Sequence, residues 1–195
     1  MTHQNKPVQL AVFASGGGSN AHRIMEYFKD SDRIRVALVV SNKREAGVLQ
    51  IAAAYGIPSL VIDRKSFYDS TDILKSLQHF DIGFIALAGF LWLIPAYLVR
   101  AFPGKILNIH PALLPKYGGK GMYGHHVHEA VKKAGETESG PTIHFVNEQY
   151  DEGDVVFQAR CSISTDDTAE DIARKVLQLE HLHYPTVIEQ VILNA

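Results

Sequence analysis

The stretch "AVFASGGGSNAHRI", residues 11–24, decides the fold, because an apolar run passes through three glycines into a helix-like segment. The apolar run begins earlier and predicts a buried strand over Val8–Phe13. Three glycines let the backbone turn sharply, and the first N–H groups of the following helix have no partners within that helix. The junction therefore predicts a strand–loop–helix unit with an anion site, to which Ser19 and Asn20 add polar side chains.

This glycine loop differs from two familiar nucleotide-binding loops. The dinucleotide spacing G-x-G-x-x-G fails, because Ala21 stands three residues after Gly18. A P-loop would continue into Gly-Lys-Ser/Thr, which this chain lacks at that point. The alternative is a plain tight turn before a helix cap. We expect the loop to bind phosphate, because exposed N–H groups and a helix N-terminus favour anions.

Outward from this junction, apolar runs alternate with helix-like segments. The further strands expected in the first half are Arg35–Val40, Ser59–Ile62, Ile82–Leu87 and Lys105–Ile109. The expected helices are Asn20–Lys29, Glu45–Tyr55 and Phe67–His79. Strands and helices in this alternation form right-handed βαβ units, so a parallel sheet is predicted.

After Gly121 the pattern changes. The expected elements are a helix over Gly124–Ala134, strands over Thr142–Val146 and Asp154–Ser162, and a long helix capped by Thr168, with Pro185 bending or breaking it near His183 or Tyr184. The short polar connection between the two strands allows an antiparallel pair or a longer loop. The prediction is a single α/β domain over residues 1–195. Its twisted sheet is Rossmann-like and mostly parallel, flanked by helices, with the last strands partly antiparallel.

Composition limits the classes of function. The 195 residues are 46% apolar and 21% charged, with a formal charge of -2, which is typical of one soluble globular domain. Such a charge gives no reason to expect a nucleic-acid or membrane partner. The single cysteine, Cys161, excludes an intrachain disulfide and a multi-cysteine metal site. The start "MTHQNKP" is polar and the next apolar run is short, so we expect a cytoplasmic protein.

Asn108 and His110 form the most informative polar pair. They lie two residues apart at the predicted carboxyl end of the fifth strand, so both side chains should project from one face. Ligands of open parallel sheets bind at that end. The alternative is a core histidine satisfied by its neighbours. Pro111 disfavours it, because the residue before proline is held extended and the strand cannot continue normally.

Three other segments are candidates for the site. Asp151 is the first of three carboxylates within four residues, although most acidic loops are simply solvated. The residues after the fourth strand, Leu91–Ile94, are apolar where a loop is normally polar, which fits either a helix start on the core or a wall for an aromatic ligand. His125 and His128 share a helical face but have only Glu129 as a further ligand, so we expect no metal.

Together these motifs resemble a known family. They are Gly16–Asn20, Leu87–Phe90, Leu107–Tyr117, His144–Val146 and Asp151–Gly153. In this order and spacing they are similar to the phosphoribosylglycinamide formyltransferases, over nearly the whole chain. The Asn-x-His-Pro-x-Leu-Leu-Pro motif is shared with other folate-dependent formyl transferases and hydrolases, and the glycine loop is more specific. The stretch "GGKGMYGHHVH", residues 118–128, is longer than the Pro-Gly-containing loop usual in the family.

The resemblance implies a role for each matching residue. Asn108, His110 and Asp151 would be catalytic, with 10-formyltetrahydrofolate as formyl donor and no metal. The phosphate of glycinamide ribonucleotide would bind to Gly18, Ser19 and Asn20, and its ribose to Glu180. The folate pocket would be formed by Leu91, Trp92, Leu93, Ile94, Asn108, Asn147, Glu148, Gln149, Tyr150 and Asp151. The implied partners are small molecules, and the implied assembly is a monomer or homodimer.

The resemblance also implies a reaction in purine biosynthesis. The amine of the acceptor would attack the formyl carbon, while a protonated His110 and the amide of Asn108 donate to the developing oxyanion. Asp151 would favour the charged imidazole and help to move the amine proton.

Two alternatives remain. The first is hydrolysis of the donor or transfer to another acceptor, in relatives that typically carry a further domain; between Val8 and Ala195 we expect no room for one. The second is a non-catalytic nucleotide-binding module, which would leave the coexistence of Asn108, His110 and Asp151 unexplained.

Overall fold

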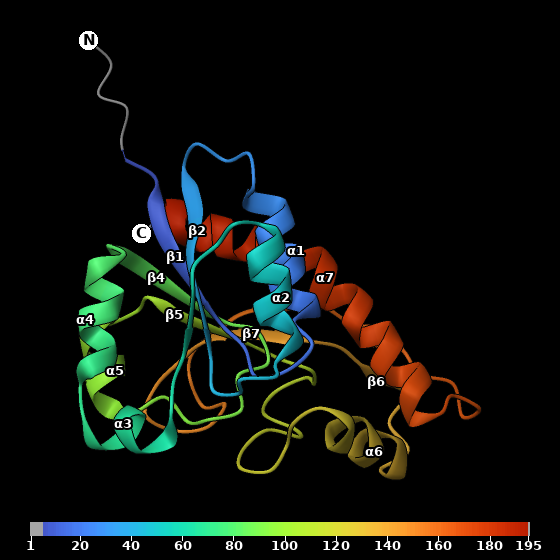
Figure 1. Ribbon diagram of the computed structural model, residues 1–195. Helices are drawn as coiled ribbons and strands as arrows, with labels where there is room; N and C mark the ends of the chain where they lie inside the picture. The colour runs from blue at the N-terminus through green and yellow to red at the C-terminus, as the bar shows by residue number, and fades with distance from the viewer. Residues whose placement is uncertain (1–5, 195) are drawn as a thin grey trace.

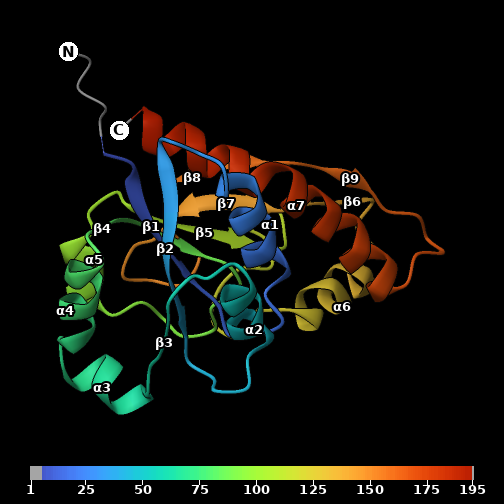
Figure 2. The same cartoon turned by 45° about the horizontal axis from the view of Figure 1, so that its top comes forward.

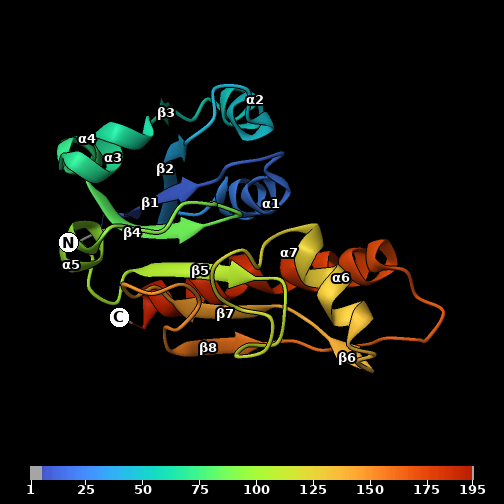
Figure 3. The ribbon, with the colours of Figure 1, turned by 90° about the horizontal axis from the view of Figure 1, so that it is seen from below.

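Seven strands form one sheet in the computed structural model, which describes residues 6–194 (Figure 1). The strands are β1 (Val8–Phe13), β2 (Ile34–Ser41), β3 (Ser59–Val61), β4 (Ile82–Leu87), β5 (Ile106–His110), β7 (Thr142–Phe145) and β8 (Val155–Gln158). Their order is β3-β2-β1-β4-β5-β7-β8, with parallel pairing from β3 to β5 and antiparallel pairing of β7 with β5 and β8 (Figure 3). The predicted mostly parallel sheet with antiparallel last strands is confirmed.

Helices cover both faces of this sheet (Figure 2). The helices are α1 (Ser19–Phe28), α2 (Gly47–Ala54), α3 (Arg64–Asp69), α4 (Asp72–His79), α5 (Ala96–Ala101), α6 (His125–Lys133) and α7 (Ala169–Leu193). Leu10 and Val12 of β1 belong to the core beneath α1, α2 and α7, whereas Ala11 and Phe13 belong to the core beneath α3, α4 and α5. This alternation is the two-residue period of a strand that is buried on both faces.

The predicted helix Phe67–His79 is wrong in one respect, because two short helices occupy this region. α3 begins earlier, at Arg64, where the carboxylate of Asp63 caps it by accepting a hydrogen bond from the N–H of Ser66 at 3.0 Å. Ser70 then adopts an extended backbone and ends the helix. Its hydroxyl accepts a hydrogen bond from the N–H of Asp72 at 3.3 Å, which starts α4. Serine competes with the helix for backbone hydrogen bonds in this way.

The predicted strand Asp154–Ser162 is also divided. β8 joins the main sheet, whereas β9 (Cys161–Ser162) pairs with β6 (Glu138–Ser139), a strand that the sequence analysis did not identify. The two segments come together at Gly140, where a Cβ atom would lie only 1.8 Å from the carbonyl oxygen of Ala159. Only glycine allows this close approach, and hydrophobic periodicity cannot reveal a contact between such distant segments.

The C-terminal helix begins as predicted but does not break. The Thr168 hydroxyl accepts a hydrogen bond from the Asp171 N–H at 3.1 Å, and the Asp171 carboxylate accepts one from the Thr168 N–H at 3.0 Å. α7 then continues through Pro185 to Leu193, so of the two predicted outcomes, a bend or a break, the break is wrong. The phenol of Tyr184 is fully buried and donates to the carbonyl groups of two strands. This packing against the sheet outweighs the local cost of the proline.

The register of the central strands positions the site. Leu107 and Ile109 belong to the core beneath α1 and α7, so Asn108 and His110 project from the opposite face of β5, as predicted. Across the antiparallel pair, Asn108 lies opposite His144, and His110 lies opposite Thr142. Polar side chains of two neighbouring strands therefore meet where β5 ends.

Candidate active site

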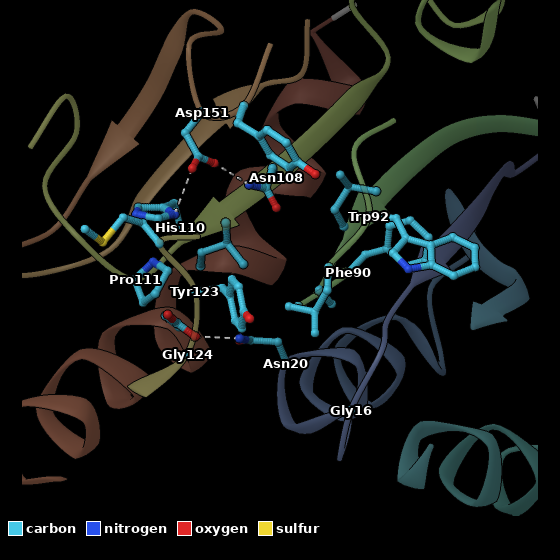
Figure 4. A pocket seen from close by; sticks show the side chains of 18 of the residues that line it. Gly16, Asn20, Phe90, Trp92, Asn108, His110, Pro111, Tyr123, Gly124 and Asp151 are labelled. Atoms are coloured by element: carbon cyan, nitrogen blue, oxygen red, sulfur yellow. Dashed lines mark hydrogen bonds and ion pairs between the residues drawn. The ribbon is translucent and has the colours of Figure 1, made fainter. Parts of the chain in front are cut away.

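A cleft of about 770 Å³ lies along the carboxyl ends of β1, β4 and β5 (Figure 4). It is lined by the glycine loop, the residues after β4, the end of β5, residues 119–125 and parts of α6 and α7. The loops after β1 and β4 are tied together, because the N–H of Leu91 donates to the Ser15 hydroxyl at 2.9 Å. The cleft occupies the position at which open α/β sheets bind ligands.

Asn108, His110 and Asp151 converge at one end of this cleft (Figure 4). The Asp151 carboxylate lies 3.5 Å from Nδ1 of His110 and accepts a hydrogen bond from the Asn108 amide at 3.4 Å. The His110 side chain is 4% exposed and that of Asp151 is 10% exposed. β7 ends beside the start of β5, so the loop after β7 folds back to bring Asp151 to this position. The three residues that sequence analysis selected from separate segments thus share one water-poor corner.

His144 is a fourth member of this cluster that the sequence analysis did not select. Its Nδ1 lies 2.8 Å from the carbonyl oxygen of Phe145, which identifies Nδ1–H as a donor. Its Nε2 lies 3.1 Å from the Asn108 amide nitrogen and 3.6 Å from the Asp151 carboxylate. His144 therefore orients the other polar groups. The sequence carried a signal, because Thr142 and His144 are polar at alternate positions of an otherwise apolar strand.

The protonation of His110 is set by opposing effects. Burial lowers the pKa of His110, while the charge of Asp151 and the contact with the Tyr117 carbonyl raise it, and burial is the larger effect. Nε2 lies 2.7 Å from that carbonyl, so Nε2 carries the proton of the neutral ring. Asp151 acts in the expected direction, yet the imidazole is neutral in the free protein, and its Nδ1 can accept a proton.

Asp151 is held in its charged form. Burial alone would raise the pKa of Asp151, but the His144 ring at 3.6 Å, the neighbouring His110 imidazole and the N–H of Gly119 together lower it below the ordinary value. The Gly119 N–H donates to the carboxylate at 2.9 Å. Asp151 itself has a φ of 57°, which is uncommon for a residue other than glycine and typical of functional loops.

The glycine loop lies at the other end of the cleft, at the start of α1. Gly18 has a φ of 81°, in the left-handed region that favours glycine. The amide of Asn20 donates to the Glu180 carboxylate of α7 at 2.5 Å. Burial raises the pKa of Glu180 to about 7, although this hydrogen bond acts to lower it. Backbone donors, an amide and a carboxyl group thus converge where the phosphate and ribose were predicted to bind.

An apolar wall completes the cleft beyond β4. Leu91, Trp92, Leu93 and Ile94 all line it, and Phe90 projects beside Trp92 (Figure 4). The Arg64 guanidinium lies over the rings of Tyr68 and Trp92, 5.2 and 5.7 Å from their centroids. Cation–π contact of this kind places a fixed positive charge beside the wall. Sequence analysis did not select Arg64, since neither pattern nor spacing relates it to Trp92.

Comparisons with known proteins agree with this geometry. A protein-family profile described as Formyl transferase matches residues 8–188. The phosphoribosylglycinamide formyltransferase of Bacillus subtilis is 38% identical over 189 residues, which cover 94% of this chain and 94% of that protein. The chain belongs to the formyl transferase family. The predicted resemblance is therefore confirmed.

Two further relatives show the extent of the likeness. The chloroplastic phosphoribosylglycinamide formyltransferase of Arabidopsis thaliana is 45% identical over 193 residues, or 96% of this chain, although the chain spans 66% of that protein. The glycinamide ribonucleotide transformylase 1 structure from Geobacillus kaustophilus is 38% identical and has a TM-score of 0.86. The match covers 95% of this formyl transferase chain and 98% of that one. Fold and sequence thus agree over nearly the whole chain.

The predicted folate residues after β7 separate into two groups. Gln149 and Tyr150 line the cleft of this formyl transferase, as does Asp151. Asn147 and Glu148 are not among the lining residues. The Asn147 side chain accepts a hydrogen bond from the Gln149 N–H, and Glu148 pairs with Arg100 at 3.2 Å. In this structure Asn147 and Glu148 therefore shape and anchor the loop.

The histidines of α6 do not gather as a metal site. His125 lies 3.1 Å from Glu129, and His126 lies 3.6 Å from the same carboxylate. Within residues 6–194, no cluster of three or more histidine, cysteine or acidic side chains is arranged to hold a metal ion. Over the same residues, no helix is long and apolar enough to cross a membrane.

Proposed function

We propose that this chain transfers the formyl group of 10-formyltetrahydrofolate to the amine of glycinamide ribonucleotide, a step of purine biosynthesis. We further propose that it acts as a single formyltransferase domain in the cytoplasm, as a monomer or homodimer. The observation that carries the proposal is the arrangement of the cleft, with Asn108, His110 and Asp151 at one end and the glycine loop at the other. The apolar wall beside them suits the flat ring system of a folate.

The acceptor is held by the glycine-loop end of the cleft. Its phosphate would meet the N–H groups of Gly18 and Ser19 at the start of α1. The Asn20 amide and the Glu180 carboxyl group would contact the phosphate and the ribose. In this orientation the acceptor amine reaches toward Asn108 and His110.

Asn108 and His110 then act on the reacting atoms. The bound folate supplies an electrophilic formyl carbon, and a C–N bond forms between it and the acceptor amine. Nδ1 of the neutral His110 can take the proton that this amine loses. The imidazolium that results is stabilised by Asp151 at 3.5 Å, and together with the Asn108 amide it can stabilise the negative oxygen. The bond from the formyl carbon to the folate nitrogen then breaks, and that nitrogen takes up a proton.

An assay with glycinamide ribonucleotide and the formyl donor tests the proposal directly. We expect formylated product with the wild-type chain, and a loss of about 10²–10³ in kcat for His110→Ala, which removes both proton acceptor and oxyanion donor. The same assay with an acceptor that lacks the phosphate should lose about a hundredfold in kcat/KM. Equal use of the two acceptors would refute the phosphate site. Release of formate without formylation of the acceptor would identify a hydrolase.

The neighbouring carboxylates provide a matched control. Asp151→Asn removes the charge that balances an imidazolium, so kcat should fall by about two orders of magnitude while the loop keeps its shape. Glu152 is adjacent but exposed, and it does not line the cleft. Glu152→Gln should therefore retain wild-type kcat. Equal losses in both variants would mean that the negative charge of the whole loop, and not Asp151, is required.

A further inference from the structure

His128 is a buried residue of the cleft to which the mechanism gives no role. It belongs to the first half of α6, is 6% exposed and lines the cleft. The other two histidines of this helix, His125 and His126, are exposed and lie near the Glu129 carboxylate. His125 also reaches the cleft, but of the three histidines only His128 is buried, so its polar ring is not simply a solvated surface group.

The buried Nδ1 atom of His128 has no hydrogen-bond partner among residues 6–194. The side-chain oxygen of Asn20 is in the same state, and both residues line the same cleft. A buried polar atom without a partner destabilises a protein, so native structures rarely contain one without a reason. Among residues 6–194, Asn42, Ser139 and His181 also carry such an atom, but only Asn20 and His128 line the cleft, where a bound ligand can supply the partner.

The surroundings of His128 define where such a ligand would lie. α6 packs against α7, which contributes Glu180 and the exposed side chain of Leu177 to the cleft. His110 also lines the cleft and is near enough to act electrostatically on His128. Burial, followed by the proximity of the His125 and His110 rings, lowers the pKa of His128 to about 4. The ring is therefore neutral at physiological pH, with one nitrogen to donate and one to accept.

We propose that His128 binds the amide that joins the glycyl group of the acceptor to its ribose, and so positions the amine for attack. This inference rests on the proposed function, because the amide lies between the ribose and the amine. A neutral imidazole can donate to the amide carbonyl or accept from its N–H. A half-turn about the Cβ–Cγ bond exchanges Nδ1 with a carbon of similar size, so either edge of the ring can present a nitrogen.

Two substitutions separate this role from a structural one. His128→Leu removes the polar atoms, whereas His128→Asn keeps a polar atom near the position of Nδ1. We expect His128→Leu to lower kcat/KM for the acceptor about tenfold to a hundredfold, and His128→Asn to recover most of it. Folate-analogue affinity should not change in either variant. The melting temperature of His128→Leu should equal or exceed that of wild type, because an unpaired buried nitrogen is removed. Wild-type kcat/KM in a folded His128→Leu protein would overturn the inference.

A binding experiment on the wild-type chain distinguishes the inference from the proposed function. The imidazole ¹⁵N signals of His128 are followed by NMR while glycinamide ribonucleotide or ribose 5-phosphate is added. Both ligands should perturb the amide signals of Gly18 and Ser19, but only the ligand with the amide should shift the His128 ring nitrogens. If both bind and neither shifts the ring, the role of His128 is overturned and the acceptor site stands. If neither binds, both proposals are refuted.

Discussion

Replacing Gly18 by alanine tests whether the glycine loop is shaped by its ligand or by its own packing. A Cβ atom at this position would lie 2.7 Å from Cβ and 2.9 Å from Cα of Val48, at the start of α2. The residue would also have to keep a φ of 81°. The left-handed conformation costs a non-glycine residue about 1–2 kcal/mol, and overpacking costs typically about 1–3 kcal/mol. The expected loss of unfolding free energy is therefore about 2–5 kcal/mol.

Gly16 and Gly17 provide matched controls in the same loop. A Cβ atom at either position would meet nothing within 4 Å, and neither residue has a positive φ. Urea denaturation followed by circular dichroism should place Gly16→Ala and Gly17→Ala within about 0.5 kcal/mol of wild type. A Gly18→Ala protein as stable as these two would refute the packing argument.

Three further measurements follow from the charges and hydrogen bonds. Because burial lowers the pKa of His110 and the neutral ring accepts the proton, kcat should fall as pH drops below 6.5 and stay level toward pH 8; a fall with rising pH would mean that the charged ring is required. Burial raises the pKa of Glu180 from 4.5 to about 7, so the folded protein loses stability relative to the unfolded chain as the pH rises from 4.5 to about 7. Glu180→Gln should therefore exceed wild type in unfolding free energy at pH 8, on the order of 3 kcal/mol, but not at pH 4.5. Tyr184→Phe leaves the buried carbonyl groups of Leu87 and Leu107 without that donor, so urea denaturation should show a loss of about 1–3 kcal/mol.

The positions of the main strands along the chain could be predicted because each strand is apolar, short and followed by a helix or turn signal. The same periodicity could not divide the segment 154–162. Its first half pairs with β7 and its second half with β6, and the change of partner occurs beside Gly140. Nor could periodicity show that α7 continues through Pro185, because the packing of Tyr184 on the sheet is a long-range effect. These misses arise where contacts between distant segments override local preference.

The candidate site shows the same limit. Asn108, His110 and Asp151 were recognisable because the resemblance implies a role for each. His144 also stands in a motif of the family, but its role depends on the strand register that places it opposite Asn108. The role of His128 depends on an unpaired buried atom. The charge of His110 also required the structure, since the balance between burial and Asp151 cannot be judged from spacing. The sequence thus identifies the residue types of the site, whereas their protonation states depend on how deeply the side chains are buried.

The pairing of His110 with Thr142 has a consequence for how such enzymes diversify. The segment between these residues contains α6 and β6. It leaves the sheet at the end of β5 and returns at the start of β7, the neighbouring strand. Lengthening a closed excursion of this kind adds little entropic cost, roughly 0.6 kcal/mol for each doubling. Insertions here need not disturb the strand register that holds Asn108 beside His144. The segment between β5 and β7 that lines the cleft can therefore vary in length and composition, as the glycine- and histidine-rich segment 118–128 illustrates, while Asn108, His110 and His144 keep their positions.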